Sequence, residues 1–106
     1  PTLEVDEELD CVLDKTRPSC FIGTGLAERL QEAQVNELVI AGMKTQYCVD
    51  TTCRAAGDLG FAAVLVEDAH TCMDTPLIGA RTIIAHHNAT LNGPFVRLAT
   101  TADVTF

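Results

Sequence analysis

The sequence predicts an α/β domain with an open, mostly parallel β-sheet, and three observations support that prediction. Residues 37–41 and 63–66 are short apolar runs of the kind that form strands buried on both faces. Segments with helical periodicity alternate with these runs, as expected of successive β-α units. The chain has 106 residues, which suffices for one compact domain and is too short for two.

The first half of the chain is predicted to contain two strands with a helix between them. Residues 11–13 form a short apolar segment that we interpret as the first strand. A helix is expected to begin at Thr24 as its N-cap and to run to about residue 34, because Leu26 and Leu30 then share one face. The apolar run at residues 37–41 is the next strand.

The second half continues the alternation around the run at residues 63–66, giving the order β-α-β-α-β-α-β. A helix is predicted from about residue 48 to residue 59, and Gly60 occupies the C′ position that glycine favours. Thr75 supplies an N-cap for a third helix reaching about residue 91, and the proline after it suits the first helical position. A last short strand is expected in the C-terminal tail.

Ligands of such sheets bind beyond the carboxyl ends of the strands. The segments predicted at those ends are residues 15–23, 42–48 and 68–74. These three segments are therefore where functional side chains are expected.

Charge and cysteine content exclude several classes of function. Fifteen acidic residues against seven basic ones give a formal charge of −8, which disfavours binding to nucleic acid or to anionic membranes. No apolar run approaches the roughly 18 to 20 residues that span a bilayer. The odd number of cysteines, five, and their uneven spacing argue against a secreted disulfide framework, and the absence of a CxxC pair argues against a zinc site. We expect a cytoplasmic protein.

Cys48 is the most suggestive single position, because it lies six residues after Gly42 where a strand has ended and a helix begins. Free N–H groups at a helix N-terminus stabilise a thiolate and can also bind an oxyanion. Lys15 follows the first predicted strand and could supply a cation at the same sheet edge. Spacing alone also allows Cys48 to be a buried apolar residue, like Cys53, and Lys15 to be solvated.

Five other polar residues have simpler interpretations. Turn and cap hydrogen bonds are expected of the polar residues in the loop after the run at residues 63–66, and packing or interface contacts are expected of two histidines in the last predicted helix. Adjacent histidines point about 100° apart on a helix and do not share a metal ion. The loop residues are Asp68, His70 and Asp74, and the helix residues are His86 and His87.

Longer motifs resemble the isochorismatase-like cysteine hydrolases. Residues 38–56 match that family's nucleophile segment, an apolar strand followed by Gly-x-x-Thr-x-x-Cys-Val. Residues 15–26 are similar to its lysine loop, Lys-x-x-x-Ser-x-Phe-x-Gly-Thr-x-Leu, and residues 64–69 resemble the strand that follows. The resemblance covers essentially the whole chain.

The resemblance implies a Cys-Lys-Asp triad in which Cys48 is the nucleophile and Lys15 is the lysine. The oxyanion hole would consist of the backbone N–H groups of Lys44 and Cys48. A cis peptide bond is implied between Met43 and Lys44. Candidates for the substrate pocket are Phe21, Met43 and Tyr47.

The resemblance also implies a three-layer, Rossmann-like α-β-α sandwich with strand order 3-2-1-4-5-6. The strand at residues 11–13 would be the third, so the first two strands and the triad aspartate would be missing. None of Asp6, Asp10 and Asp14 follows a buried apolar strand, as that aspartate should. We therefore expect residues 1–106 to be the C-terminal part of a single domain of roughly 170 to 200 residues, or to receive the missing strands from another chain.

The function that the resemblance implies is hydrolysis of a small amide, carbamoyl or related C–N substrate through a thioester-type intermediate. No cofactor is required, and the metal of some nicotinamidases would bind outside this chain. A homo-oligomer is implied as well.

The alternative function is that of a truncated, non-catalytic assembly partner or pseudoenzyme of the same fold. A thiol redox protein is disfavoured, because Cys53 lies about 140° around the helix from Cys48.

Overall fold

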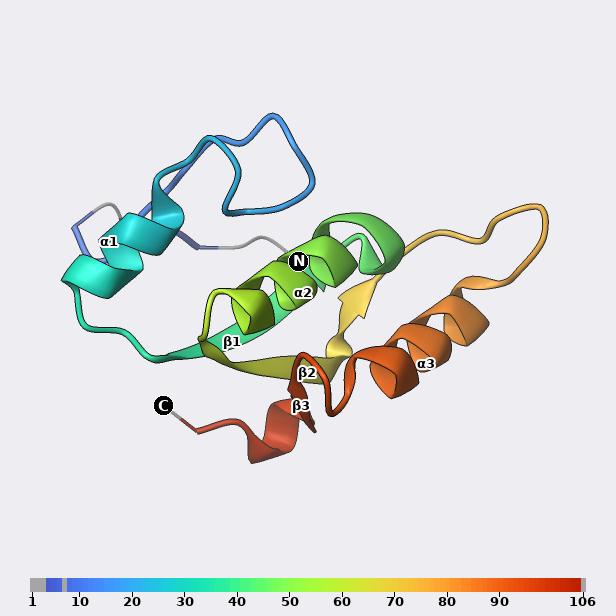
Figure 1. The fold of residues 1–106 in the computed structure, drawn as a ribbon. Helices are drawn as coiled ribbons and strands as arrows, with labels where there is room; N and C mark the ends of the chain where they lie inside the picture. The colour runs from blue at the N-terminus through green and yellow to red at the C-terminus, as the bar shows by residue number, and fades with distance from the viewer. Residues whose placement is uncertain (1–3, 7, 106) are drawn as a thin grey trace.

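The computed structural model describes residues 4–6 and 8–105. Within them, three parallel strands form one sheet in the order β1 (Glu37–Met43), β2 (Ala62–Thr71) and β3 (Arg97–Ala99). Figure 1 shows the sheet at the centre of the molecule, with helices between successive strands. The α/β class and the parallel sheet are confirmed.

Three α-helices connect and cover the strands. Helix α1 (Leu26–Glu32) precedes β1, α2 (Asp50–Asp58) joins β1 to β2, and α3 (Ala80–Leu91) joins β2 to β3. A π-helical turn, η1 (Thr45–Val49), links β1 directly to α2, and a 3-10 turn, η2 (Thr101–Asp103), follows β3. None of the helices in the described part of the chain is long and apolar enough to cross a bilayer.

The core lies between the sheet and helices α2 and α3, which cover the same face (Figure 1). Alternate residues of a strand point to opposite faces, so Leu38 and Ile40 face this core while Val39 does not. The inner side of α2 contributes small residues, which lets the helix approach the sheet closely. The fully buried members of the core are Cys53, Ala56, Leu65 and Leu91.

The pairing of β1 with β2 is interrupted by a bulge. Ile40 pairs with Leu65, but two residues later Gly42 pairs with His70, five residues further along β2. The extra residues of β2 bend it away from β1 before the two strands pair again. As a result, His70 lies beside the end of β1, next to the turn that follows.

The predicted strand at residues 11–13 is wrong. These residues are not a strand, and their side chains are largely exposed. A strand needs a neighbour to take its backbone hydrogen bonds. Within the described residues no strand pairs with the outer edge of β1, so the segment has no sheet to join. The observed strands are those predicted as the fourth, fifth and sixth.

All three helices begin later than predicted. The N-cap of the first is Gly25 rather than Thr24, and the second begins at Asp50 rather than at about residue 48 because the π-helical turn precedes it. The third begins at Ala80, because the Thr75 hydroxyl oxygen accepts the N–H groups of Leu77 and Ile78 and holds a turn there instead. The C′ position of Gly60 after α2 is confirmed by its φ of 92°.

The face of the sheet opposite the helices is only partly covered. A hollow of about 320 Å³ lies there beside η2. It borders β1, the strand whose outer edge is unpaired in the described part of the chain. Its lining is mainly apolar and consists of Val39, Ala41, Val66, Ala69, Thr101 and Val104.

The close approach of α2 to the segment before β3 gives a test of the packing. A Cβ on Gly57 would lie 3.2 Å from the Phe95 carbonyl oxygen and 3.3 Å from its Cα. Gly57→Leu should therefore lower the free energy of unfolding by roughly 1–3 kcal/mol, measured by urea denaturation. Asp58→Leu, at an exposed position of the same helix, is the control. Equal midpoints for the two variants would contradict this packing constraint.

Candidate active site

The structure brings Lys15 and Cys48 together from segments 33 residues apart. Lys15 Nζ lies 3.2 Å from Cys48 Sγ and also donates to the carbonyl of Arg17 at 3.2 Å. The Arg17 bond orients the ammonium group toward the sulfur. The ammonium group can therefore donate a hydrogen bond to the sulfur.

The π-helical turn places Cys48 at the carboxyl edge of the sheet. The Lys44 carbonyl accepts the N–H groups of Tyr47 and Val49, both at 3.1 Å. In an α-helix that carbonyl would take the N–H of Cys48, so the wider turn leaves the Cys48 N–H outside the usual i→i−4 pattern. The peptide bond between Met43 and Lys44 is cis, as expected. The oxyanion role of these amides stays a prediction.

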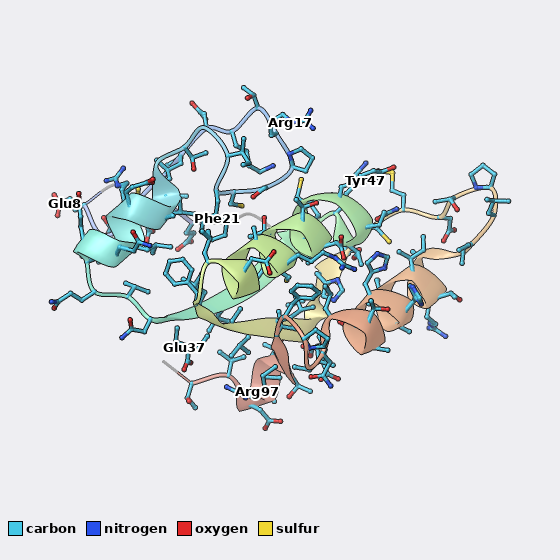
Figure 2. The ribbon with its side chains drawn as sticks, viewed as in Figure 1. Glu8, Arg17, Phe21, Glu37, Tyr47 and Arg97 are labelled. Atoms are coloured by element: carbon cyan, nitrogen blue, oxygen red, sulfur yellow. The ribbon has the colours of Figure 1, made fainter. Side chains whose placement is uncertain are left out.

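A small cavity of about 80 Å³ is lined by both Lys15 and Cys48. Met43 belongs to its wall, whereas Phe21 and Tyr47 do not. Tyr47 is 57% exposed. Figure 2 shows it at the outside of the turn. The cavity is lined by Lys15, Cys20, Ile40, Ala41, Met43, Cys48, Val49 and Thr52.

Two contacts anchor the lysine loop to the rest of the domain. The N–H of Cys20 donates to the Thr52 hydroxyl oxygen at 3.1 Å, which ties the loop to α2. The Phe21 ring stacks on Phe61, with ring centroids 5.9 Å apart, and so packs against the core. The lysine loop is thus attached to α2, the helix that begins just after Cys48, and to the core residue that precedes β2.

Cys53 differs from Cys48 although both lie on the segment that follows β1. Its side chain is fully buried. Burial raises the pKa of the Cys53 thiol to about 12, with smaller contributions from Asp50 and Cys20. This thiol stays protonated at neutral pH and cannot serve as the nucleophile.

A polar network that the sequence did not predict lies beside the turn. The buried His70 contacts the Thr45 hydroxyl through Nδ1 at 2.8 Å and the Asn88 side-chain oxygen through Nε2 at 2.7 Å. Asn88 Nδ2 donates to the Glu67 carbonyl at 3.1 Å. We expected turn or cap hydrogen bonds for His70, and this is wrong because the bulge in β2 turns its side chain inward.

The two aspartates of the same region do make turn and cap contacts. Asp74 accepts the N–H of Ala80 at 2.7 Å and so caps the start of α3. Asp68 accepts hydrogen bonds from both the backbone N–H and the hydroxyl of Thr101. The backbone bond is the main cause that lowers the pKa of Asp68. These bonds tie β2 to η2.

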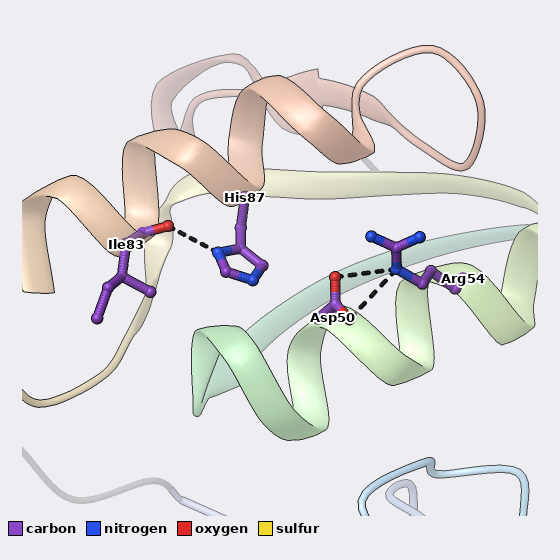
Figure 3. Close-up of polar contacts among 4 residues, drawn as sticks. All are labelled: Asp50, Arg54, Ile83 and His87. Atoms are coloured by element: carbon purple, nitrogen blue, oxygen red, sulfur yellow. Dashed lines mark hydrogen bonds and ion pairs between the residues drawn. The ribbon is translucent and has the colours of Figure 1, made fainter. Parts of the chain in front are cut away.

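The remaining polar contacts near the site stabilise the helices. His87 Nδ1 donates to the Ile83 carbonyl at 2.8 Å, and Arg54 Nε forms an ion pair with Asp50 at 3.1 Å, as Figure 3 shows. Arg54 also lies over the Phe95 ring at 5.0 Å. Within residues 4–6 and 8–105, no three His, Cys, Asp or Glu side chains gather as metal ligands would.

Comparison with known proteins agrees with this fold. The isochorismatase domain matches residues 1–103, so the chain belongs to the isochorismatase family. An uncharacterised isochorismatase family protein of Bacillus subtilis is 38% identical over 100 residues, covering 89% of this chain and 54% of the relative. The chain spans about half the length of this relative and of a second Bacillus subtilis protein of the family.

Solved structures of the family show the same arrangement. An isochorismatase from Pseudomonas putida superposes with a TM-score of 0.90 and 32% identity, covering 95% of this chain and 54% of that one. A cysteine hydrolase from Pseudomonas syringae gives a TM-score of 0.83 and 26% identity, covering 94% and 52%. The fold of this chain is therefore the fold of the isochorismatase family, whose members include hydrolases.

The buried thiol predicts a specific pH dependence. Because the pKa of Cys53 rises from 9.0 to about 12 on folding, its contribution to stability is complete below pH 9 and is lost as the pH rises toward 12. Wild type should therefore lose unfolding free energy relative to Cys53→Ala between pH 9 and pH 11, measured by urea denaturation. All other titrating groups are common to both proteins, and parallel pH profiles would rule out the shift.

Proposed function

We propose that this chain carries the nucleophile of a cysteine hydrolase that acts on a small amide, carbamoyl or related C–N substrate. The observation that carries the proposal is the contact of 3.2 Å between Lys15 Nζ and Cys48 Sγ at the carboxyl edge of the sheet. Membership of the isochorismatase family and the likeness to a solved cysteine hydrolase support it.

In the proposed reaction the Cys48 thiol first transfers its proton to the triad aspartate, which lies outside this chain. Lys15 stabilises the thiolate, and the sulfur attacks the carbonyl carbon. The N–H groups of Lys44 and Cys48 donate to the developing oxyanion. The C–N bond then breaks, ammonia or an amine leaves with a proton, and water hydrolyses the thioester to release the acid and the free thiol.

We propose further that the rest of the domain pairs with the outer edge of β1 and supplies the aspartate. Relatives are about twice as long as this chain, which covers 54% of the first of them. The open edge and the apolar hollow beside Val39 and Ala41 provide a surface for that part. The isolated chain of 106 residues is expected to be inactive, whether the missing strands come from the same chain or from another.

One observation favours the alternative, a non-catalytic assembly partner or pseudoenzyme. No carboxylate is among the described residues that line the cavity between Lys15 and Cys48. If the aspartate is also missing from the assembled protein, the thiol lacks a proton acceptor and turnover cannot occur. The two functions are separated by the experiments below.

Selective alkylation tests the Lys15–Cys48 pair. A brief, limiting dose of iodoacetamide at pH 7 should give one fast adduct, located at Cys48 by peptide mass mapping, and the intact mass should be recorded before and after. Lys15→Gln should slow this reaction about tenfold, because the nearby positive charge is lost. Arg29→Gln, which removes an exposed positive charge on α1, should leave the rate unchanged. Equal rates for both variants would rule out the pair.

Turnover tests the nucleophile itself. In the intact protein, screened for ammonia or amine release from small amides and carbamoyl compounds, Cys48→Ser should abolish release. The half-buried side chain loses little packing, so the urea midpoint should stay within error of wild type. Activity that survives Cys48→Ser would refute the nucleophile assignment. Absence of release by wild type, with Cys48 still selectively alkylated, would favour the non-catalytic alternative.

A further inference from the structure

We propose that His70 is a positioning residue that holds the turn between Lys44 and Cys48 in the geometry that binds an oxyanion. It acts through Thr45 and is itself held by Asn88. This inference rests on the function proposed above and identifies what fixes its oxyanion hole.

The three side chains form a chain of hydrogen bonds across three elements, in which Thr45 and His70 are buried and Asn88 is half-buried. Thr45 is fully buried and His70 is 5% exposed. The Thr45–His70 contact is 2.8 Å and the His70–Asn88 contact is 2.7 Å. These residues belong to η1, β2 and α3, so the network joins the turn to the strand and the helix beside it.

Each group in the network has one role in hydrogen bonding. The Glu67 carbonyl can only accept, so Asn88 presents Nδ2 to it and directs its side-chain oxygen at His70. His70 Nε2 must therefore carry a hydrogen and donate. In the neutral ring Nδ1 is then an acceptor, and the Thr45 hydroxyl donates to it. With this assignment every side-chain polar atom of the two buried residues, Thr45 and His70, has a hydrogen-bond partner, and the Thr45 hydroxyl hydrogen points at His70 Nδ1.

The position of Thr45 gives the network its effect on the site. Thr45 is the first residue of η1, directly after Lys44 and three residues before Cys48. The turn has no side-chain cap at its N-terminus. The hydroxyl bond to His70 is thus the side-chain contact that fixes the first residue of the turn, and with it the directions of the two proposed amide donors.

The register of the sheet makes this contact possible. After the bulge His70 pairs with Gly42, which places its ring next to the turn. Amide donors stabilise an oxyanion only when they lie within about 2.7–3.1 Å of its position. A small rotation of the turn would therefore weaken oxyanion binding while the thiol stayed beside Lys15.

Two reagents that react with the same thiol separate positioning from simple folding. Iodoacetamide is attacked at a saturated carbon, so a C–S bond forms and iodide leaves without an oxyanion. p-Nitrophenyl acetate is attacked at its carbonyl, forms an oxyanion, and then releases p-nitrophenolate to leave an acetyl thioester on Cys48. The ratio of acylation rate to alkylation rate at Cys48 therefore reports the oxyanion hole and cancels the reactivity of the thiolate.

The experiment compares variants of the network in the intact protein. Thr45→Val and His70→Gln should lower the ratio at least tenfold, with alkylation changed less than threefold. Thr45→Ser keeps the hydroxyl and should restore the ratio to within about threefold of wild type. Thr75→Val removes a hydroxyl from an exposed turn and serves as the matched control. If Thr45→Val fails to fold, Asn88→Ala releases the ring from the far side.

The outcomes are distinct. A ratio that falls in Thr45→Val and His70→Gln, and not in Thr45→Ser or Thr75→Val, supports the positioning role. An unchanged ratio in the folded network variants overturns it while leaving Cys48 as the nucleophile. A wild-type protein in which neither reagent prefers Cys48 would overturn the proposed function and this inference with it.

Discussion

The parallel pairing of β1 with β2 is the constraint on which the other features depend. It sets the direction in which β1 delivers the chain to η1, and its bulge decides which β2 side chain lies beside that turn. Without the extra residues of β2, His70 would not pair with Gly42. The strand pair thus positions both the Cys48 thiol and the Thr45–His70–Asn88 network. The helices cover one face of this sheet.

The lysine side of the site is held in a different way. Lys15 comes from a loop without regular secondary structure, and its position depends on contacts made further along that loop. The Cys20–Thr52 hydrogen bond and the Phe21–Phe61 stacking attach the loop to α2 and to the core. The thiol is therefore positioned by the turn at the end of β1, and the ammonium group is held by the contacts of its loop with α2 and with the core.

The sequence predicted those elements whose formation depends on residues close together in the chain. The apolar runs that became β1 and β2, the C′ glycine at Gly60 and the meeting of Lys15 with Cys48 were all predicted, the last through the family motifs. The strand at residues 11–13 was wrong because pairing depends on strands elsewhere. The start of α3 was missed because the Thr75 side chain stabilises a competing turn. The His70 network was missed because it depends on the bulge in β2, and no residue pattern in the sequence indicates where that bulge lies.

The π-helical turn has a consequence for how this segment can change. Its hydrogen bond from the Val49 N–H to the Lys44 carbonyl spans one residue more than an α-helical bond would, and this extra residue sets the direction of the Cys48 side chain ahead of α2. Removing it would rotate Cys48 by about 100° relative to the helix, which could remain intact. A change in the number of residues between β1 and α2 would therefore turn the thiol away from Lys15 even where Thr45 and Cys48 are kept.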